Sequence, residues 1–456
     1  MPLGPLDQRS LLAIPLAVIF IYRPTANTVE ELIPIQRLGR ALSLLLDYYP
    51  HLTGRIVINP KDQSPEIQQL GTGAKLVAAH CSLPLNAFEA EIQDDEPGSP
   101  ARLIGPNLPD GGNALLPPFD LTEEGAAQDA ILTVQHTKFP CGGVSIGLRL
   151  RHIICDAAGF FQLARDMAEL YRGLKTKPSL APPAIHSYLS DLMLSAEERQ
   201  ENLQIKPTLF DLAPVLHPLA KSETIAPEPV LGRIVRFSSQ ELSAIKAAAG
   251  KDRPVSTFCA LAAHLWQSIY QARLQCGSPL PRQFLASVDL RSREQFNVSP
   301  RYFPNCVLCP VFSLSDAILR DASLSEVAAA VHDNIQPLDP VKVERNLRWL
   351  AAQPDKQRVR LRYRFEEAGV QVSQWSKFGM YRGTELDVPP TLVAQPFTPI
   401  SLLDGLMYFM ATEDQLIQSE TSPGVTSGSI DVSLALSEQT WKILDKDVRF
   451  RQYRSW

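Results

Sequence analysis

The chain has 456 residues, of which 45% are hydrophobic and 20% are charged, and its formal net charge at pH 7 is -5. This length predicts two domains of roughly 200 residues each, and the composition is typical of a soluble globular protein. A small negative charge without any dense run of Lys and Arg argues against a nucleic-acid partner. Seven scattered cysteines, an odd number, favour a reducing compartment over a secreted disulfide framework.

The first apolar stretch of the chain is "LLAIPLAVIFIY" at residues 11–22. It is too short to span a bilayer, contains a proline, and is not followed by a cleavage site of small residues. We therefore expect a buried strand, not a signal peptide or a membrane anchor, in a cytoplasmic protein without a membrane partner. A helix is expected next within 33–49, and "GRIVINP" at 54–60 predicts a strand.

The remaining elements follow from apolar periodicity and from turn and cap residues. Helices are expected at 157–174, 195–203, 238–250 and 255–274. Strands are expected at 130–139, 143–153, 283–290, 304–313, 392–399, 405–412 and 428–436. Proline-rich sequence with weak periodicity between 175 and 229 predicts a crossover between domains. Because strands and helices alternate in both halves, the predicted fold class is α/β with two comparable domains.

Two catalytic patterns overlap in "CGGVSIGLRLRHIICDAAGF" at 141–160. "GVSIG" matches the G-x-S-x-G pattern of serine hydrolases, and "HIICD" matches H-x-x-x-D, in which a histidine is the base. The hydrolase pattern requires a sharp strand-to-helix turn at the serine. Here the apolar alternation continues straight through Ser145, so we predict that this serine lies in mid-strand and is not a nucleophile.

His152 is expected at the end of a strand, and Asp156 directly before a helix. Functional groups gather at such ends of an α/β sheet, and a histidine there can take a proton from an attacking hydroxyl or amine near pH 7. A structural interpretation is equally open from the residues alone. In that interpretation Asp156 caps the helix and His152 is a partly buried imidazole.

Eight segments, in order along the chain, resemble the BAHD family of coenzyme-A-dependent acyltransferases, in particular its fungal-type branch. They are "GPLDQ" (4–8), "YYPHLTGRI" (48–56), "FPCGGVSIGLRLRHIICDAAGFFQLARDMAELYRG" (139–173), "STFCALAAHLWQ" (256–267), "SVDLRSR" (287–293), "RYFPNC" (301–306), "VSQWSKFGMY" (372–381) and "LLDGLMYFM" (402–410). The resemblance implies two similar chloramphenicol acetyltransferase-like domains, each a mixed β-sheet with flanking helices. We expect these domains at 1–180 and 231–456, a crossover at 181–230, and a segment near 375–400 that packs on the N-terminal sheet.

The resemblance implies an acyl-CoA-dependent O-acyltransferase of specialised metabolism that acylates a hydroxyl group, with acetyl as the expected acyl group. Acyl-CoA would be a co-substrate, no cofactor would be permanently bound, and a small molecule would be the acceptor. The protein is expected to be a monomer. His152 would be the general base without an acyl-enzyme, and Asp156 would pair with Arg291 to support it.

The same resemblance implies further site residues. They are Ser373 and Trp375 as candidate oxyanion donors, Tyr302 and Asn305 near the domain interface, and Arg253 as a candidate phosphate contact for coenzyme A. No histidine has companions at metal-ligand spacing, and the single pair Cys306-x-x-Cys309 is interpreted as small apolar residues in a strand. No metal site is therefore expected.

The sequence departs from the family pattern in three places. Ala157 follows Asp156 where the family usually has glycine, and Pro304 stands where glycine is usual. The family's D-F-G-W-G motif, expected shortly after Tyr381, is replaced by "RGTELDVPPTLVAQP". This replacement motivates an alternative, a catalytically silent member that binds a small hydrophobic metabolite. An intact His152 with its aspartate support favours the enzyme.

Overall fold

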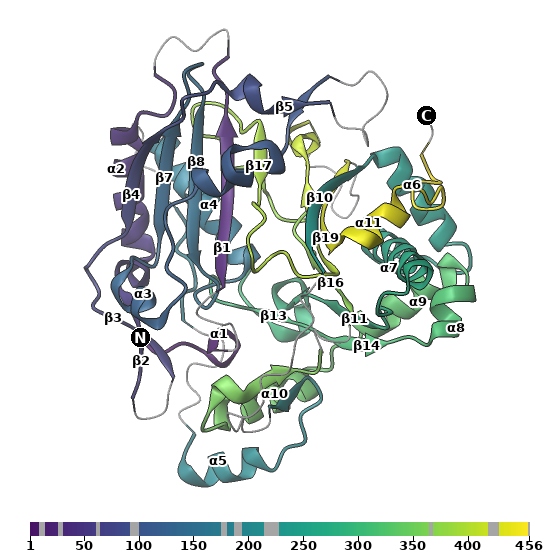
Figure 1. Cartoon of the computed structure of the whole chain (residues 1–456). Coiled ribbons are helices and arrows are strands. Elements are labelled where there is room, and N and C mark those ends of the chain that lie inside the picture. Colours follow the sequence, from purple (N-terminus) through teal and green to yellow (C-terminus); the bar gives the residue numbers. More distant parts are fainter. Residues whose placement is uncertain are drawn as a thin grey trace.

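The computed structural model describes residues 1–8, 14–25, 31–60, 64–91, 100–174, 180–186, 194–213, 228–363, 368–417 and 428–454. In this part of the chain the two largest sheets have five and six strands. Each sheet carries its own helices, and the two halves lie side by side (Figure 1). Both sheets contain parallel and antiparallel pairs, so the predicted α/β class with two mixed-sheet halves is confirmed.

The five-stranded sheet has the order β17-β1-β8-β7-β4. Its strands are β1 (Pro15–Tyr22), β4 (Lys75–His80), β7 (Thr133–Lys138), β8 (Val144–Arg151) and β17 (Leu392–Ala394). Strands β1 and β8 pair antiparallel from Pro15↔Arg151 to Tyr22↔Val144, and every residue of β8 is buried. Apolar residues of α2 (Ile35–Tyr48) and α4 (Ala157–Gly173) pack with these strands in one core, which explains the apolar alternation of the sequence.

Strand β17 reaches this sheet from the C-terminal part of the chain, pairing Ile19↔Ala394. The residues just before it are tied to the same half, since the Tyr22 hydroxyl donates to the carbonyl oxygen of Thr384 at 2.9 Å. The sequence that replaces the D-F-G-W-G motif therefore lies along the N-terminal sheet.

The six-stranded sheet has the order β10-β19-β18-β16-β11-β14. Its strands are β10 (Val230–Phe237), β11 (Gln283–Ala286), β14 (Val311–Ser313), β16 (Val370–Gln374), β18 (Leu406–Ala411) and β19 (Ile430–Ser437). The helices beside it are α6 (Ser239–Ala249), α7 (Thr257–Cys276), α8 (Asp316–Asp321), α9 (Leu324–Ile335) and α11 (Glu438–Leu444), on the outer side of the molecule (Figure 1). The long helix α7 is buried on nearly all sides and forms the centre of this core.

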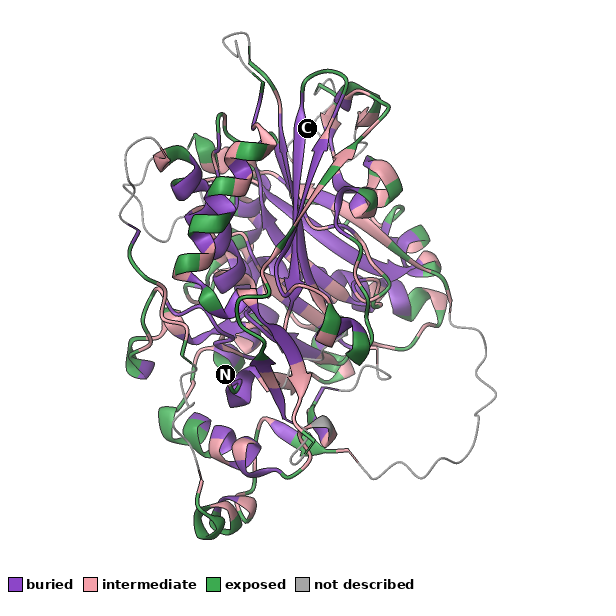
Figure 2. Ribbon diagram, turned by 90° about the vertical axis from the view of Figure 1, so that its left-hand side faces the viewer, coloured by how far each residue is buried: buried purple, intermediate pink, exposed green. Residues whose placement is uncertain are grey.

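Smaller elements complete the described fold. They are α1 (Pro5–Gln8), α3 (Glu123–Gln128), α5 (Ala196–Leu203), α10 (Pro340–Ala352), and the two-stranded pairs β2 (Arg55–Ile58) with β3 (Pro65–Gln68), β5 (Glu89–Ala90) with β6 (Arg102–Leu103), β9 (Phe210–Leu212) with β15 (Val359–Leu361), and β12 (Val288–Asp289) with β13 (Val307–Leu308). The buried residues concentrate in the central strands, whereas the outer helices are exposed along their outward faces (Figure 2). None of the helices within the described ranges combines the length and the hydropathy needed to cross a bilayer.

Several expected elements differ from the structure. The strand expected at 304–313 is two short strands, β13 and β14, because Pro310 lies between them and a proline has no N–H for a sheet. The strand expected at 392–399 ends at Ala394, shortly before Pro396. The helices α8, α9 and α10 were not predicted, although each begins at a capping side chain, of Ser315, Ser323 and Asp339 respectively.

Candidate active site

His152 lies in the loop of residues 152–156 that joins β8 to α4. Its backbone N–H donates to the carbonyl oxygen of Ile14 at 2.8 Å, which extends the pairing beside β1. Its side chain is half-buried. The loop thus begins where a fully buried strand ends, and this backbone hydrogen bond continues the pairing of β8 beside β1 as far as His152.

Asp156 makes two contacts that the sequence analysis considered, the cap of α4 and the pair with Arg291. Its Oδ1 accepts a hydrogen bond from the backbone N–H of Gly159 at 3.1 Å and so caps α4. The guanidinium of Arg291 binds both carboxylate oxygens at 3.0 and 3.1 Å, and the N–H of Cys306 donates to Oδ2 at 2.7 Å. With only 3% of the side chain exposed, this carboxylate is fully committed to holding the loop.

Arg291 connects the loop to the C-terminal half. Besides Asp156 it binds Asp289 at 2.9 Å, and it donates to the backbone carbonyls of Tyr302 and Pro304 at 2.8 and 2.7 Å. Burial alone would lower the pKa of Arg291, but the two carboxylates raise it above its usual value, so the guanidinium is permanently charged. A buried ion pair of this kind depends on both partners.

Asp7 and Asn305 form a second support that the sequence did not reveal. Asp7 is buried in α1, and its Oδ1 accepts hydrogen bonds from the backbone N–H and the side-chain amide of Asn305, each at 2.9 Å. The same amide group of Asn305 donates to the backbone carbonyl of His152 at 2.9 Å. Asp7, which belongs to the segment "GPLDQ", therefore supports the His152 loop from the N-terminal helix α1, through Asn305.

Gly159 explains one departure from the family pattern. A Cβ at this position would lie 2.1 Å from the carbonyl oxygen of Phe303, so no larger residue fits without moving the backbone. The close approach of the two halves occurs at Gly159 and not at Ala157, which tolerates its side chain.

Ser373 and Trp375 lie together at the end of β16. The indole N–H of Trp375 donates to the Ser373 hydroxyl oxygen at 3.0 Å, and the ring packs against Phe161 and Tyr408. The indole N–H is thereby engaged, whereas the Ser373 hydroxyl keeps its own proton for donation. Trp375 can orient Ser373 in this arrangement, and Ser373 is the better candidate for an oxyanion donor.

Two alternative nucleophiles are poorly placed. Ser145 is fully buried within β8, opposite Ile21, with no turn at its position. Burial raises the pKa of the Cys155 thiol well above its usual value, so little thiolate forms. Neither residue has the exposure or activation that acyl-enzyme chemistry requires.

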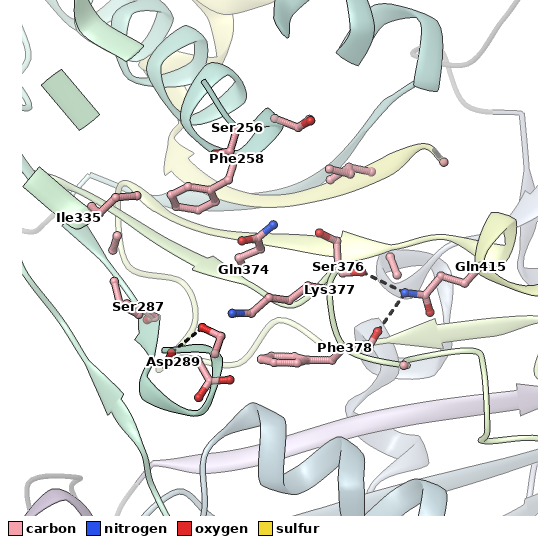
Figure 3. A pocket seen from close by; sticks show the side chains of 18 of the residues that line it. Ser256, Phe258, Ser287, Asp289, Ile335, Gln374, Ser376, Lys377, Phe378 and Gln415 are labelled. Carbon is pink, nitrogen blue, oxygen red and sulfur yellow. Dashed lines mark hydrogen bonds between the residues drawn. The ribbon is translucent and has the colours of Figure 1, made fainter. Parts of the chain in front are cut away.

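A cavity of about 620 Å³ lies in the C-terminal half (Figure 3). Among the described residues that line it, four carry cationic side chains: Lys246, Arg293, Lys377 and Arg382. One carries a carboxylate, Asp289, and this residue connects the cavity to Arg291 and hence to the His152 loop. The excess of positive charge suits a ligand with several negative charges.

Lys377 extends into this cavity, with its ammonium group directed toward the side of Ser287 and Asp289 (Figure 3). The side chain is exposed to the hollow, yet surrounding protein lowers its pKa from the usual value. The N-terminus of α7, with the residues Ser256, Thr257 and Phe258, forms part of the lining. Backbone N–H groups at a helix N-terminus favour anionic groups.

The other predicted residues have structural contacts. Arg253 donates to the carbonyl of Ala329 and pairs with Asp333 at 2.7 Å, and it does not line the cavity. Tyr302 is buried, and its ring lies 5.4 Å from the guanidinium of Arg291. Within the described ranges, no three His, Cys, Asp or Glu side chains come together in a metal-binding group.

Comparison with known proteins links this geometry to one family. The model of the Transferase family matches residues 1–384. Hydroxycinnamoyltransferase 2 of Oryza sativa subsp. japonica is 28% identical over 331 residues, which cover 70% of this chain and 68% of that protein. (Z)-3-hexen-1-ol acetyltransferase of Arabidopsis thaliana is 27% identical over 280 residues, covering 58% and 53%.

Solved structures show the same fold. TRI101 of F. graminearum, complexed with coenzyme A and deoxynivalenol, has a TM-score of 0.72 at 20% identity and covers 99% of this chain and 98% of its own. Vinorine synthase has a TM-score of 0.68 at 16% identity, covering 99% and 93%.

Proposed function

This chain belongs to the Transferase family of BAHD acyltransferases, which use acyl-CoA as co-substrate, and from that premise we propose that it acylates a hydroxyl group of a specialised metabolite, with His152 as the general base. We further propose acetyl as the transferred group, supported by the acetyltransferase of Arabidopsis thaliana among the relatives. Hydroxycinnamoyl is the donor to test beside it, because several relatives are hydroxycinnamoyltransferases.

The observation that carries this proposal is that, within the loop of residues 152–156, the other side chains that can exchange a proton are engaged or buried. Its residues with side chains that can exchange a proton are His152, Cys155 and Asp156. Asp156 is held by four hydrogen bonds, and the thiol of Cys155 is buried with a raised pKa. His152 is the residue left to act as a base near neutral pH.

The reaction then needs no acyl-enzyme. The acceptor oxygen attacks the thioester carbonyl carbon while His152 removes its proton, and a tetrahedral intermediate forms. The hydroxyl of Ser373, oriented by Trp375, would donate to the oxyanion. When the intermediate collapses, the carbon–sulfur bond breaks and the proton passes from His152 to the leaving sulfur, which yields an ester and free coenzyme A.

We place acyl-CoA in the cationic cavity. Its phosphates would be bound by the cationic side chains and by the N-terminus of α7, and its thioester would extend toward Asp289 and the His152 loop. The cavity's lining residues support this placement, since one carboxylate is outnumbered by four cations.

The test is the release of free thiol from acetyl-, malonyl- and hydroxycinnamoyl-CoA with a panel of hydroxylated metabolites. We expect His152→Ala to lower turnover by about 10²- to 10⁴-fold, the usual contribution of a general base. His80→Ala, at an exposed position on β4, is the matched control and should retain wild-type turnover. Equal turnover in His152→Ala and wild type would exclude His152 as the base.

A further inference from the structure

The side-chain amide of Gln415 holds one wall of the cavity, the loop of residues 376–381. It does so through four hydrogen bonds to the loop's backbone. Nε2 donates to the carbonyl oxygens of Ser376 at 3.0 Å and Phe378 at 2.9 Å, and Oε1 accepts from the N–H groups of Met380 and Tyr381, each at 3.1 Å. Figure 3 shows the two donated bonds. A primary amide has two donors and two acceptor positions, so its whole capacity is used on this loop.

This loop supplies much of the cavity's inner surface. Its lining residues are Ser376, Lys377, Phe378 and Gly379. A side chain next to the loop also binds the backbone of Gln415, because Arg382 donates to the carbonyl oxygen of Gln415 at 3.0 Å. The position of the Lys377 ammonium group in the cavity therefore depends on the Gln415 side chain.

The first residue of the loop and the residue before it are anchored separately. The backbone N–H groups of Trp375 and Ser376 both donate to the carbonyl oxygen of Phe409 on β18, at 2.9 and 2.7 Å. Ser373 and Trp375 thus keep their places through the sheet and not through Gln415. A change at Gln415 should disturb the cavity wall and leave the candidate oxyanion donor in position.

We infer that Gln415 is a positioning residue for acyl-CoA, which it serves by fixing the backbone of residues 376–381 as a wall of the binding cavity. This inference rests on the proposed function and deepens it, because it assigns coenzyme affinity to a side chain outside the H-x-x-x-D motif. Only a glutamine satisfies all four backbone groups: a carboxylate lacks the two donors, and asparagine is shorter.

The test compares Gln415→Met, which keeps the length of the side chain but removes every hydrogen bond, with wild type. Gln353→Met is the matched control, since Gln353 is a buried glutamine with a bond to Trp349 on α10, outside the cavity. Kd for coenzyme A is measured by calorimetry, and KM for acyl-CoA and kcat by thiol release. We expect Gln415→Met to raise Kd and KM about tenfold with kcat within about twofold of wild type, and Gln353→Met to change none of the three.

A loss of kcat with Kd and KM unchanged would overturn the inference, as would wild-type affinity in Gln415→Met. If Gln415→Met does not fold, Gln415→Glu takes its place at high salt, where repulsion between its charge and the phosphates is screened. Faster amide exchange at Met380 and Tyr381 in Gln415→Met is the expected structural signature, because their N–H groups lose the Oε1 acceptor, and unchanged exchange in that variant contradicts it. If wild type binds coenzyme A and releases no thiol, the proposed function fails while the affinity test of Gln415 stands. If wild type does not bind coenzyme A, both fail.

Discussion

The two halves of the molecule contain the same strand pair followed by a helix, and they differ at the junction. In the N-terminal half β1 and β8 pair over eight residues, and in the C-terminal half β10 and β19 do the same. Strand β19 ends at Ser437, which itself caps α11, so the helix begins at once. Between β8 and α4 the chain inserts residues 152–156.

The two junctions also differ in how many contacts hold them. At the C-terminal junction the Ser437 hydroxyl accepts from the N–H of Thr440, and Asp404 accepts from the N–H of Ser437. The inserted loop needs more support, from a buried ion pair with Arg291 and from the Asp7–Asn305 contact. The same architecture thus has a short junction after β19 and a longer, more strongly supported one after β8 that carries His152.

The largest expected effect is a loss of unfolding free energy at the β8–α4 junction that the β19–α11 junction does not show. Removing one partner of the buried pair, in Asp156→Asn or Arg291→Met, should lower the free energy of unfolding by about 3–5 kcal/mol, because the other charge stays buried. Arg291→Met should be the more severe, since Asp156 and Asp289 would then repel each other. Urea unfolding measures the loss, and thiol release should fall with it.

The matched change at the other junction is Ser437→Ala. It removes a helix cap and should cost about 1 kcal/mol with no loss of turnover. If Asp156→Asn cost no more than Ser437→Ala, the two junctions would be equivalent and the ion pair would not be what holds the His152 loop.

The sequence predicted the parts of this comparison that depend on local patterns. The alternation through Ser145 predicted a continuous β8, and the position of Asp156 predicted a helix start. The Asp156–Arg291 contact followed from family resemblance and not from spacing. Family resemblance implied Arg253 as a phosphate contact for coenzyme A; in the structure its side chain pairs with Asp333 on α9, a direction that depends on tertiary packing.

The missed contacts are long-range and have no local signal. Asp7 and Asn305 are separated by 298 positions, and the bonds of Gln415 reach residues 34–39 positions away. No periodicity or cap predicts such pairs, because the fold alone brings them together. The helices α8 and α9 did have a local signal in the capping serines, but their apolar pattern is short.

The second expected effect concerns Asp7, which supports the His152 loop and is not among the residues that line the cavity. Both of its oxygens accept hydrogen bonds, Oδ2 from Gly4 and Oδ1 from Asn305. In Asp7→Asn one carboxylate oxygen becomes an NH2 group, which repels the donor of Gly4 or the donors of Asn305, and the loss of negative charge weakens the hold on the Asn305 amide that donates to His152. We expect kcat to fall on the order of tenfold with KM for acyl-CoA unchanged.

A control variant distinguishes positioning from general destabilisation. Asp166→Asn removes a buried carboxylate of α4 that binds Tyr49 and Arg301 but does not contact the His152 loop. It should lower stability and leave the pH profile of kcat unchanged. In a His152→Ala background, Asp7→Asn should cause no further loss of turnover. An additive loss would mean that Asp7 does not act through His152.

The smallest expected effect compares one buried histidine from each half, His51 and His264. Burial lowers the pKa of His51 from 6.5 to about 3, with a further contribution from His186, and burial lowers that of His264 from 6.5 to about 4. His264 donates to the carbonyl of Phe450 at 2.9 Å, whereas neither ring nitrogen of His51 has a hydrogen-bond partner among the described residues. His51→Leu should therefore stabilise the protein at pH 7.5, and His264→Leu should destabilise it.

On acidification both leucine variants should lose less unfolding free energy than wild type. Above pH 6.5 each histidine is neutral in both the folded and the unfolded chain, so its contribution to stability is constant. Below pH 6.5 the unfolded chain binds a proton that the folded chain excludes until about pH 3 for His51 and about pH 4 for His264, so stability falls with pH. Between pH 7.5 and 5.5 each leucine variant should lose about 1 kcal/mol less than wild type in urea unfolding. An equal loss in wild type and His51→Leu would mean that His51 is protonated in the folded protein, and that its burial in the N-terminal core is incomplete.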